Sequence, residues 1–132
     1  MAWCFEDEVD AYADSILDVL RDGRALVPPL WAYEVANVLL GAERRRRLRR
    51  ADSASFLELL AALPLEIQGL EGTSSVGMLT DLGREFHLSA YDLAYLALAM
   101  RERLPLATRD TRLRATARAA GVAHLVPKAG RR

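Results

Sequence analysis

The sequence has 132 residues, of which 52% are hydrophobic and 27% are charged, and its formal net charge is zero. This size and mixture are typical of one globular domain, which we expect to span residues 1–132. No apolar run approaches the roughly 20 residues of a membrane-spanning helix, and the N-terminus lacks the pattern of a secretion signal. The single cysteine excludes an intramolecular disulfide. We therefore expect a cytoplasmic protein without membrane contact.

The neutral total hides an uneven distribution of charge. Residues 1–22 contain seven acids and one arginine, whereas residues 44–50 contain six arginines and one leucine. A dense arginine cluster can bind phosphates, because the guanidinium group matches the geometry of phosphate oxygens. It can equally be the solvated end of a helix, where cations meet the negative end of the helix dipole. The sequence leaves both interpretations open.

Segments of helical periodicity alternate with short apolar segments along the chain. The periodicity predicts helices at residues 7–21, from Leu30 to about Arg45, from Asp52 as N-cap to Leu63, from Thr73 or Ser74 to about His87, at residues 90–100, and from Asp110 to Ala120. The apolar segments predict strands at residues 25–27, 65–67, 104–108 and 122–126, followed by a frayed tail at residues 127–132. This order predicts an α/β fold with a mainly parallel sheet and helices on both faces.

The predicted helix at residues 90–100 is unusual because all its residues except Asp92 are apolar or aromatic. Such a helix is expected to be buried on all sides. A carboxylate there is costly unless it is paired, hydrogen-bonded or bound to a metal ion. Ser89 offers one explanation, because a serine three residues before an acid resembles a capping box.

Two further acids come shortly after predicted strands. Glu34 lies in the first two turns of the helix that follows residues 25–27, and Asp110 lies two residues after Thr108. Each has a structural alternative, because Asp110 can cap its helix and Glu34 can pair with an arginine. Since the carboxyl ends of parallel strands meet at one edge of a sheet, we expect Glu34, Asp92 and Asp110 to gather there.

This group of acids favours one kind of chemistry. Oxygen ligands without cysteine or histidine suit Mg²⁺ or Mn²⁺, and such a site can activate water and stabilise charge on a phosphate. The sequence contains no phosphate-binding loop, dinucleotide motif or nucleophilic serine elbow. Metal-dependent hydrolysis of phosphodiester bonds is therefore the reaction class that the sequence favours.

Three blocks of the sequence together resemble the PIN domain family, and most closely its VapC-type members, which are toxins of bacterial type II toxin-antitoxin systems. The blocks are residues 29–39 with Glu34 and Asn37, residues 89–99 with Asp92, and residues 106–113 with Thr108 and Asp110. The resemblance implies a three-layer α/β/α fold and an endoribonuclease that needs Mg²⁺ or Mn²⁺ and cuts structured RNA such as tRNA or rRNA. It also implies a homodimer that is held inactive by a VapB-type antitoxin.

The resemblance assigns roles to individual residues. It makes Glu34, Asp92 and Asp110 the catalytic metal ligands, and it makes Asn37 and Thr108 residues that orient them. The helical hairpin at about residues 30–63 would contact the dimer partner and the antitoxin.

PIN domains begin with an apolar central strand that ends in a metal-binding aspartate, and residues 1–8 do not match this pattern. We therefore expect that strand and its aspartate to precede Met1 in the natural protein. One alternative is a PIN-like module with impaired catalysis that acts by binding proteins. Cleavage of DNA is a third interpretation.

Overall fold

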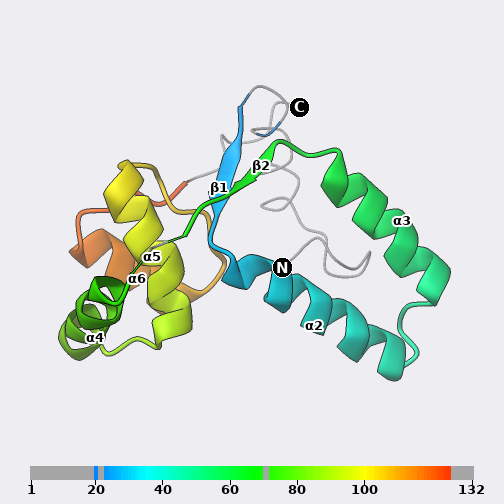
Figure 1. Cartoon of the computed structure of the whole chain (residues 1–132), viewed down its shortest axis with the longest axis horizontal. Helices are drawn as coiled ribbons and strands as arrows, with labels where there is room; N and C mark the ends of the chain where they lie inside the picture. Colours follow the sequence, from blue (N-terminus) through cyan, green and yellow to red (C-terminus); the bar gives the residue numbers. More distant parts are fainter. Residues whose placement is uncertain (1–19, 21–22, 70–71, 126–132) are drawn as a thin grey trace. The chain divides into compact units, whose positions relative to one another are not determined.

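The computed structural model describes residues 20, 23–69 and 72–125 (Figure 1). Their elements follow the order β1 (Ala25–Val27), α2 (Leu30–Arg44), α3 (Arg50–Ala61), β2 (Leu65–Ile67), α4 (Ser74–Phe86), α5 (Ala90–Glu102) and α6 (Thr111–Ala119). The predicted helix at residues 7–21 and the tail at residues 127–132 lie outside the described residues, apart from Leu20, which is helical and buried. The chain divides into two compact units, the first including Trp31–Glu66 and the second including Leu26–Leu30 and Ile67–Val126.

The strands β1 and β2 pair as a small parallel sheet, at the residues where the sequence predicts them. The Ala25 N–H donates to the Pro64 carbonyl at 3.0 Å, and the Gln68 N–H donates to the Val27 carbonyl at 2.9 Å. Together with the five described helices, this sheet confirms the predicted α/β class, although helices make up most of it.

The two predicted strands near the C-terminus are wrong in extent. Within the described residues they are reduced to one isolated parallel bridge between Leu106 and His124. A ladder would continue through the Thr108 carbonyl, but that oxygen accepts a hydrogen bond from the Arg114 side chain at 3.2 Å and lies 3.0 Å from Nε2 of His124. Side chains thus occupy the acceptor that a longer strand would need.

In the first unit, α2 and α3 form a helical hairpin around a small apolar core. Its buried members are Val35, Leu39, Ala42 and Leu60. Leu48, in the connection between the helices, packs against both parts of this core. The hairpin is therefore closed by the residues that connect its two helices as well as by the helices themselves.

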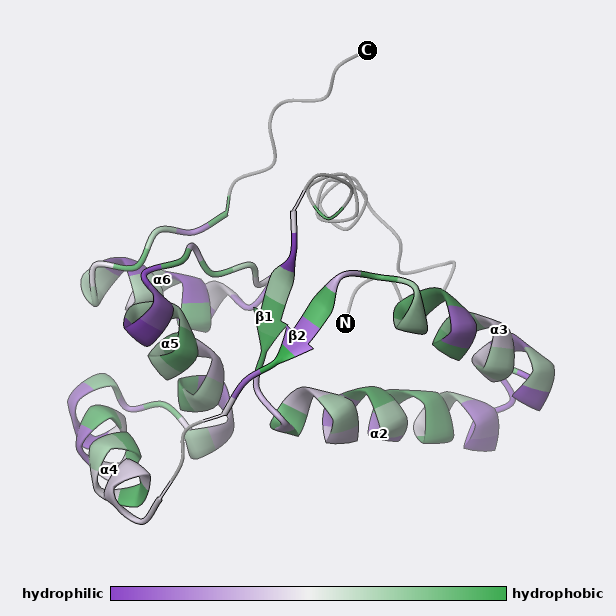
Figure 2. Ribbon diagram, turned by 45° about the horizontal axis from the view of Figure 1, so that its top comes forward, coloured by the Kyte–Doolittle hydropathy of each residue, from purple (hydrophilic) through white to green (hydrophobic). Residues whose placement is uncertain are grey.

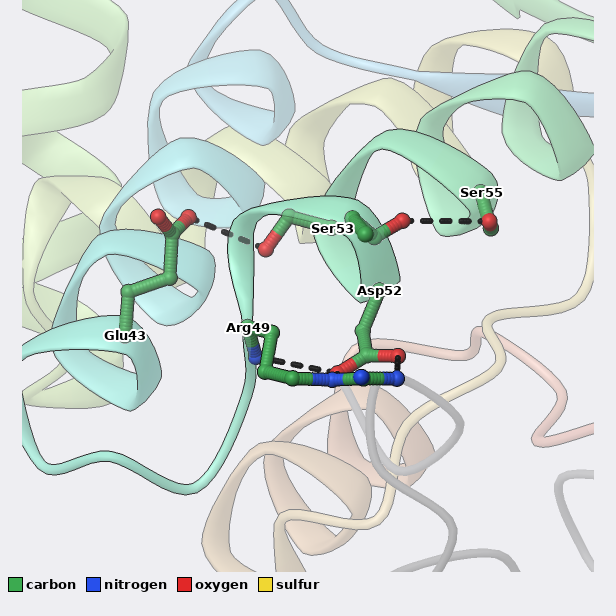
Figure 3. Close-up of polar contacts among 6 residues, drawn as sticks. Glu43, Arg49, Asp52, Ser53 and Ser55 are labelled. Carbon is green, nitrogen blue, oxygen red and sulfur yellow. Dashed lines mark hydrogen bonds and ion pairs between the residues drawn. The ribbon is translucent and has the colours of Figure 1, made fainter.

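The start of α3 corrects one prediction. The N-cap is Arg49, and Asp52 is the third residue of the helix rather than its cap (Figure 3). The Asp52 carboxylate accepts hydrogen bonds from the Arg49 guanidinium at 3.2 Å and from the Arg49 N–H at 2.9 Å, and these bonds lower the pKa of Asp52. An acid can cap a helix from inside its first turn, so the N-cap lies three residues earlier than expected.

In the second unit, α5 packs against α4 and α6. Leu93 and Leu96 are 1% and 0% exposed, and they share a core with Leu106, Leu113 and other apolar residues. The predicted burial of this helix is confirmed for its middle, from Leu96 to Ala99. It is wrong for the first turn, where Tyr91 is 66% exposed because no described element covers that side chain.

The helices α2 and α5 end in the same backbone motif. Arg46 and Arg103 have positive φ angles of 57° and 55°. The residue after each one donates its N–H to a carbonyl five residues earlier, from Arg47 to Ala42 at 2.9 Å and from Leu104 to Ala99 at 3.1 Å. These are the bonds of a Schellman motif, in which glycine is the usual left-handed residue. A side chain at this position costs about 1–2 kcal/mol.

Glycine at either position is therefore expected to stabilise the protein. For both Arg46→Gly and Arg103→Gly we expect the free energy of unfolding, measured by urea denaturation, to rise by up to about 1 kcal/mol. Ala115→Gly, in the middle of α6, is the matched control and is expected to lower it by about 1 kcal/mol, because glycine there only weakens a helix. If Arg46→Gly and Arg103→Gly lowered the free energy of unfolding as much as Ala115→Gly, the backbone at the two helix ends would not be strained.

In the described part of the chain, none of the helices combines the length and the apolar character that crossing a membrane requires.

Candidate functional site

Asp92 lies in the first turn of α5, and its side chain is half-buried. Ser89 is the N-cap of this helix, and its Oγ accepts a hydrogen bond from the Asp92 N–H at 3.2 Å. Within the described part of the chain, the Asp92 carboxylate itself accepts no hydrogen bond and forms no salt bridge. Only half of the expected capping box is thus formed: the Ser89 hydroxyl caps the Asp92 N–H, whereas the Asp92 carboxylate does not accept a backbone N–H among the described residues and stays available for another ligand.

Asp110 is the N-cap of α6, as one of its two sequence interpretations predicts. Its Oδ1 accepts a hydrogen bond from the Leu113 N–H at 2.8 Å, and the side chain is exposed. The cap uses one carboxylate oxygen, and a carboxylate can bind a cation through the other oxygen at the same time. Capping and metal binding are therefore compatible at this position.

The segment that precedes α6 is held in place by hydrogen bonds at Thr108. Its Oγ1 accepts a hydrogen bond from the Asp110 N–H at 3.1 Å. Its carbonyl accepts the hydrogen bond from Arg114, which itself belongs to α6. Thr108 thus fixes the backbone that carries Asp110, which is a contact suited to a residue that orients a ligand.

The starts of α5 and α6 lie at the same end of the second unit. Arg112, in the first turn of α6, donates from Nη2 to the His87 carbonyl at 2.8 Å. His87 ends α4 and lies two residues before Ser89. Leu93 follows Asp92 in the sequence, and the Leu113 N–H binds Asp110. Both leucines belong to one core cluster. These contacts support the predicted proximity of the two acids.

The contact of Arg112, which joins the start of α6 to the end of α4, is one that the sequence interpretation misses. A cation in the first turn of a helix is disfavoured by the helix dipole, so its presence there was a usable signal. The partner, a backbone carbonyl of another helix end, has no sequence pattern that could have identified it.

Glu34 and Asn37 lie on α2 with exposed side chains. They are three positions apart and therefore share one side of the helix. Glu34 belongs to the first unit, whereas Asp92 and Asp110 belong to the second. Among residues 20, 23–69 and 72–125, no three side chains of the histidine, cysteine, aspartate and glutamate types form a group that fits a metal ion. The gathering of all three acids into one cluster thus stays a prediction.

The chemistry of the available donors fits a divalent cation of the hard type. Asp92 and Asp110 offer carboxylate oxygens, which Mg²⁺ and Mn²⁺ prefer over nitrogen or sulfur. Both acids stand at the starts of helices, where backbone N–H groups and the helix dipole also attract anions such as phosphate. An arrangement of this kind can bring a cation and a phosphate group together.

A family model described as PIN domain matches residues 1–119. A search of curated proteins finds no significant match.

Proposed function

The chain belongs to the PIN domain family, and from this premise we propose that it is an endoribonuclease that requires Mg²⁺ or Mn²⁺. PIN domains are generally metal-dependent nucleases, so a nuclease-type function is the family expectation. The proposal goes further in naming RNA as the substrate, with structured molecules such as tRNA or rRNA as its class. The likeness of the three sequence blocks to VapC-type toxins supports this choice.

The observation that carries the proposal is the Asp92 carboxylate. It is half-buried in the first turn of α5 and, among the described residues, has no hydrogen-bond partner. Partial burial of a charge costs free energy that a bound cation would offset. Of the titratable groups near the start of this helix, it is the one whose position a metal ion explains best.

The proposed roles of the residues follow from their positions. Asp92 and Asp110 would hold the cation, with Glu34 as a further ligand, and Asn37 and Thr108 would orient these acids. When bound, the cation supplies the positive charge that stabilises a phosphate group as its ester bond breaks. The start of α5 would help to hold the substrate phosphate through its N–H groups.

The biological role that we propose is that of a cytoplasmic toxin, homodimeric and inhibited by a VapB-type antitoxin. Several large apolar side chains of the hairpin support a protein partner, since Tyr33 is 72%, Leu57 is 50% and Leu59 is 54% exposed. The same observation favours a second candidate function, a PIN-like module with impaired catalysis that acts only through this partner.

Nucleic-acid cleavage separates these functions. The protein is expected to cleave a tRNA mixture with Mn²⁺ and to leave single-stranded DNA of the same length intact. Gel electrophoresis of labelled substrates measures both, and EDTA should abolish cleavage. Calorimetry should detect Mn²⁺ binding without any substrate. Absence of both Mn²⁺ binding and cleavage would favour the module with impaired catalysis. Equal cleavage of DNA and RNA would show that the protein is a general nuclease rather than a ribonuclease.

A further inference from the structure

We propose that the connection between α2 and α3 is an RNA-binding surface, separate from the proposed metal site, which binds the phosphodiester backbone through arginines. The surface consists of residues 44–50 and is called the arginine tip below. Figure 2 shows hydrophilic residues gathered where α2 passes into α3. The inference rests on the proposed ribonuclease function, for which it names a second point of substrate contact.

The arginine tip has more positive charge than the acids next to it in the sequence can neutralise. Residues 43–52 contain six arginines and two acids, Glu43 and Asp52, and so have a net charge of plus four. Both acids are already engaged, because Glu43 accepts a hydrogen bond from Ser53 Oγ at 2.9 Å and Asp52 binds Arg49 (Figure 3). Among the described residues, the side chains of four exposed arginines have no hydrogen-bond or salt-bridge partner, namely Arg44, Arg45, Arg46 and Arg50.

Helix electrostatics explains only one half of the tip. Arg44 lies in the last turn of α2, where a cation stabilises the helix. Arg50 is the first residue of α3, where the dipole disfavours a cation. The solvated end of a helix therefore accounts for Arg44 but not for Arg50.

The backbone of the tip argues in the same direction. Arg46 holds a left-handed conformation that glycine would adopt at lower cost, so stability alone does not explain an arginine there. Its side chain is nevertheless exposed, as are those of Arg44, Arg45 and Arg47. Binding of an anionic ligand would explain why an arginine occupies this position.

The backbone of the tip is also held in place, by one polar and one apolar contact. Ser53 is 6% exposed, and its bond to Glu43 joins the two helices. Leu48 anchors the connecting segment in the apolar core of the hairpin. Because the backbone is fixed in advance, less conformational freedom is lost when a ligand binds.

The chemistry of the tip identifies phosphates rather than bases as its target. Residues 43–52 contain no aromatic side chain on which a base could stack. Guanidinium groups form paired hydrogen bonds with phosphate oxygens, independently of base sequence. Binding should therefore depend strongly on salt concentration and little on RNA sequence.

Two matched double variants of the full-length protein test this inference. Arg45→Gln with Arg50→Gln removes two charges from the tip, whereas Arg103→Gln with Arg118→Gln removes two exposed arginines of the second unit. Fluorescence anisotropy with a labelled tRNA, in EDTA so that no cleavage occurs, measures the affinity of each. The tip variant is expected to bind about tenfold more weakly and to show a slope of log affinity against log salt that is shallower by about 1.5. The control should change affinity less than about twofold.

Arg46→Gly gives an independent readout, because it is expected to be at least as stable as the natural protein but to bind the tRNA about two- to threefold more weakly. Arg103→Gly, its counterpart at the end of α5, should bind normally. A tip variant that binds RNA as tightly as its control, with the same salt dependence, would overturn the inference, as would equal losses in both variants. Tip-dependent binding by a protein that never cleaves RNA would uphold the inference while refuting the nuclease function.

Discussion

Replacing Asp92 by asparagine is expected to lower the rate of Mn²⁺-dependent RNA cleavage at least about 100-fold, because it removes a proposed metal ligand. Loss of a residue that only orients a ligand typically lowers metal affinity or activity by about 10- to 100-fold. The same change should alter the free energy of unfolding by no more than about 1 kcal/mol, the usual contribution of a charge at a helix start. The bond that caps α5 uses the Asp92 N–H, which asparagine keeps. Initial cleavage rates and urea denaturation measure the two effects.

Ser89→Ala is the matched control for this prediction. It removes the hydroxyl that accepts the Asp92 N–H but leaves the carboxylate in place. We expect it to cost about 1 kcal/mol of stability and to change the cleavage rate only a few-fold. If Asp92→Asn instead lost stability like Ser89→Ala and retained its cleavage rate, Asp92 would be a structural residue and the proposed site would be wrong.

Replacing Leu96 by alanine should cause the largest loss of stability, about 2–5 kcal/mol, because the side chain is 0% exposed and its removal leaves a cavity in the core of the second unit. A loss of this size is a large fraction of the usual stability of a domain. Urea denaturation followed by circular dichroism measures it. Leu104→Ala is the control, since this leucine is 44% exposed and should cost less than about 1 kcal/mol. Equal losses would show that the core is not centred on α5.

Local patterns were sufficient to predict the elements that are bounded by clear signals. The strand β1 ends before Pro28 and Pro29, and α2 begins directly after them, as expected. Patterns failed where a side chain competes with the backbone, as at the Thr108 carbonyl, which is hydrogen-bonded to Arg114 instead of to a strand. They also misplaced the start of α3, because an acid such as Asp52 can serve either at the cap or inside the first turn.

The candidate site was predictable to a similar degree. The cap at Asp110 and the interaction of Ser89 with Asp92 each join residues three positions apart. Both can therefore be predicted from the local sequence. The bond between Arg112 and the His87 carbonyl joins two segments that are distant along the chain, and nothing in the local sequence marks the pair. The relation of Glu34 to the other acids is of this second, long-range kind.

The pairing of β1 with β2 has a consequence for the order in which the chain folds. The bond from Ala25 to Pro64 closes a loop of roughly 40 residues, and closing a flexible loop of that length costs entropy before any contact compensates for it. The hairpin of α2 and α3 occupies most of that loop, and its core contacts join residues that are closer along the chain than Ala25 and Pro64, so they cost less loop entropy and form sooner. Folding of the hairpin should therefore precede the sheet and bring its strands within reach of each other.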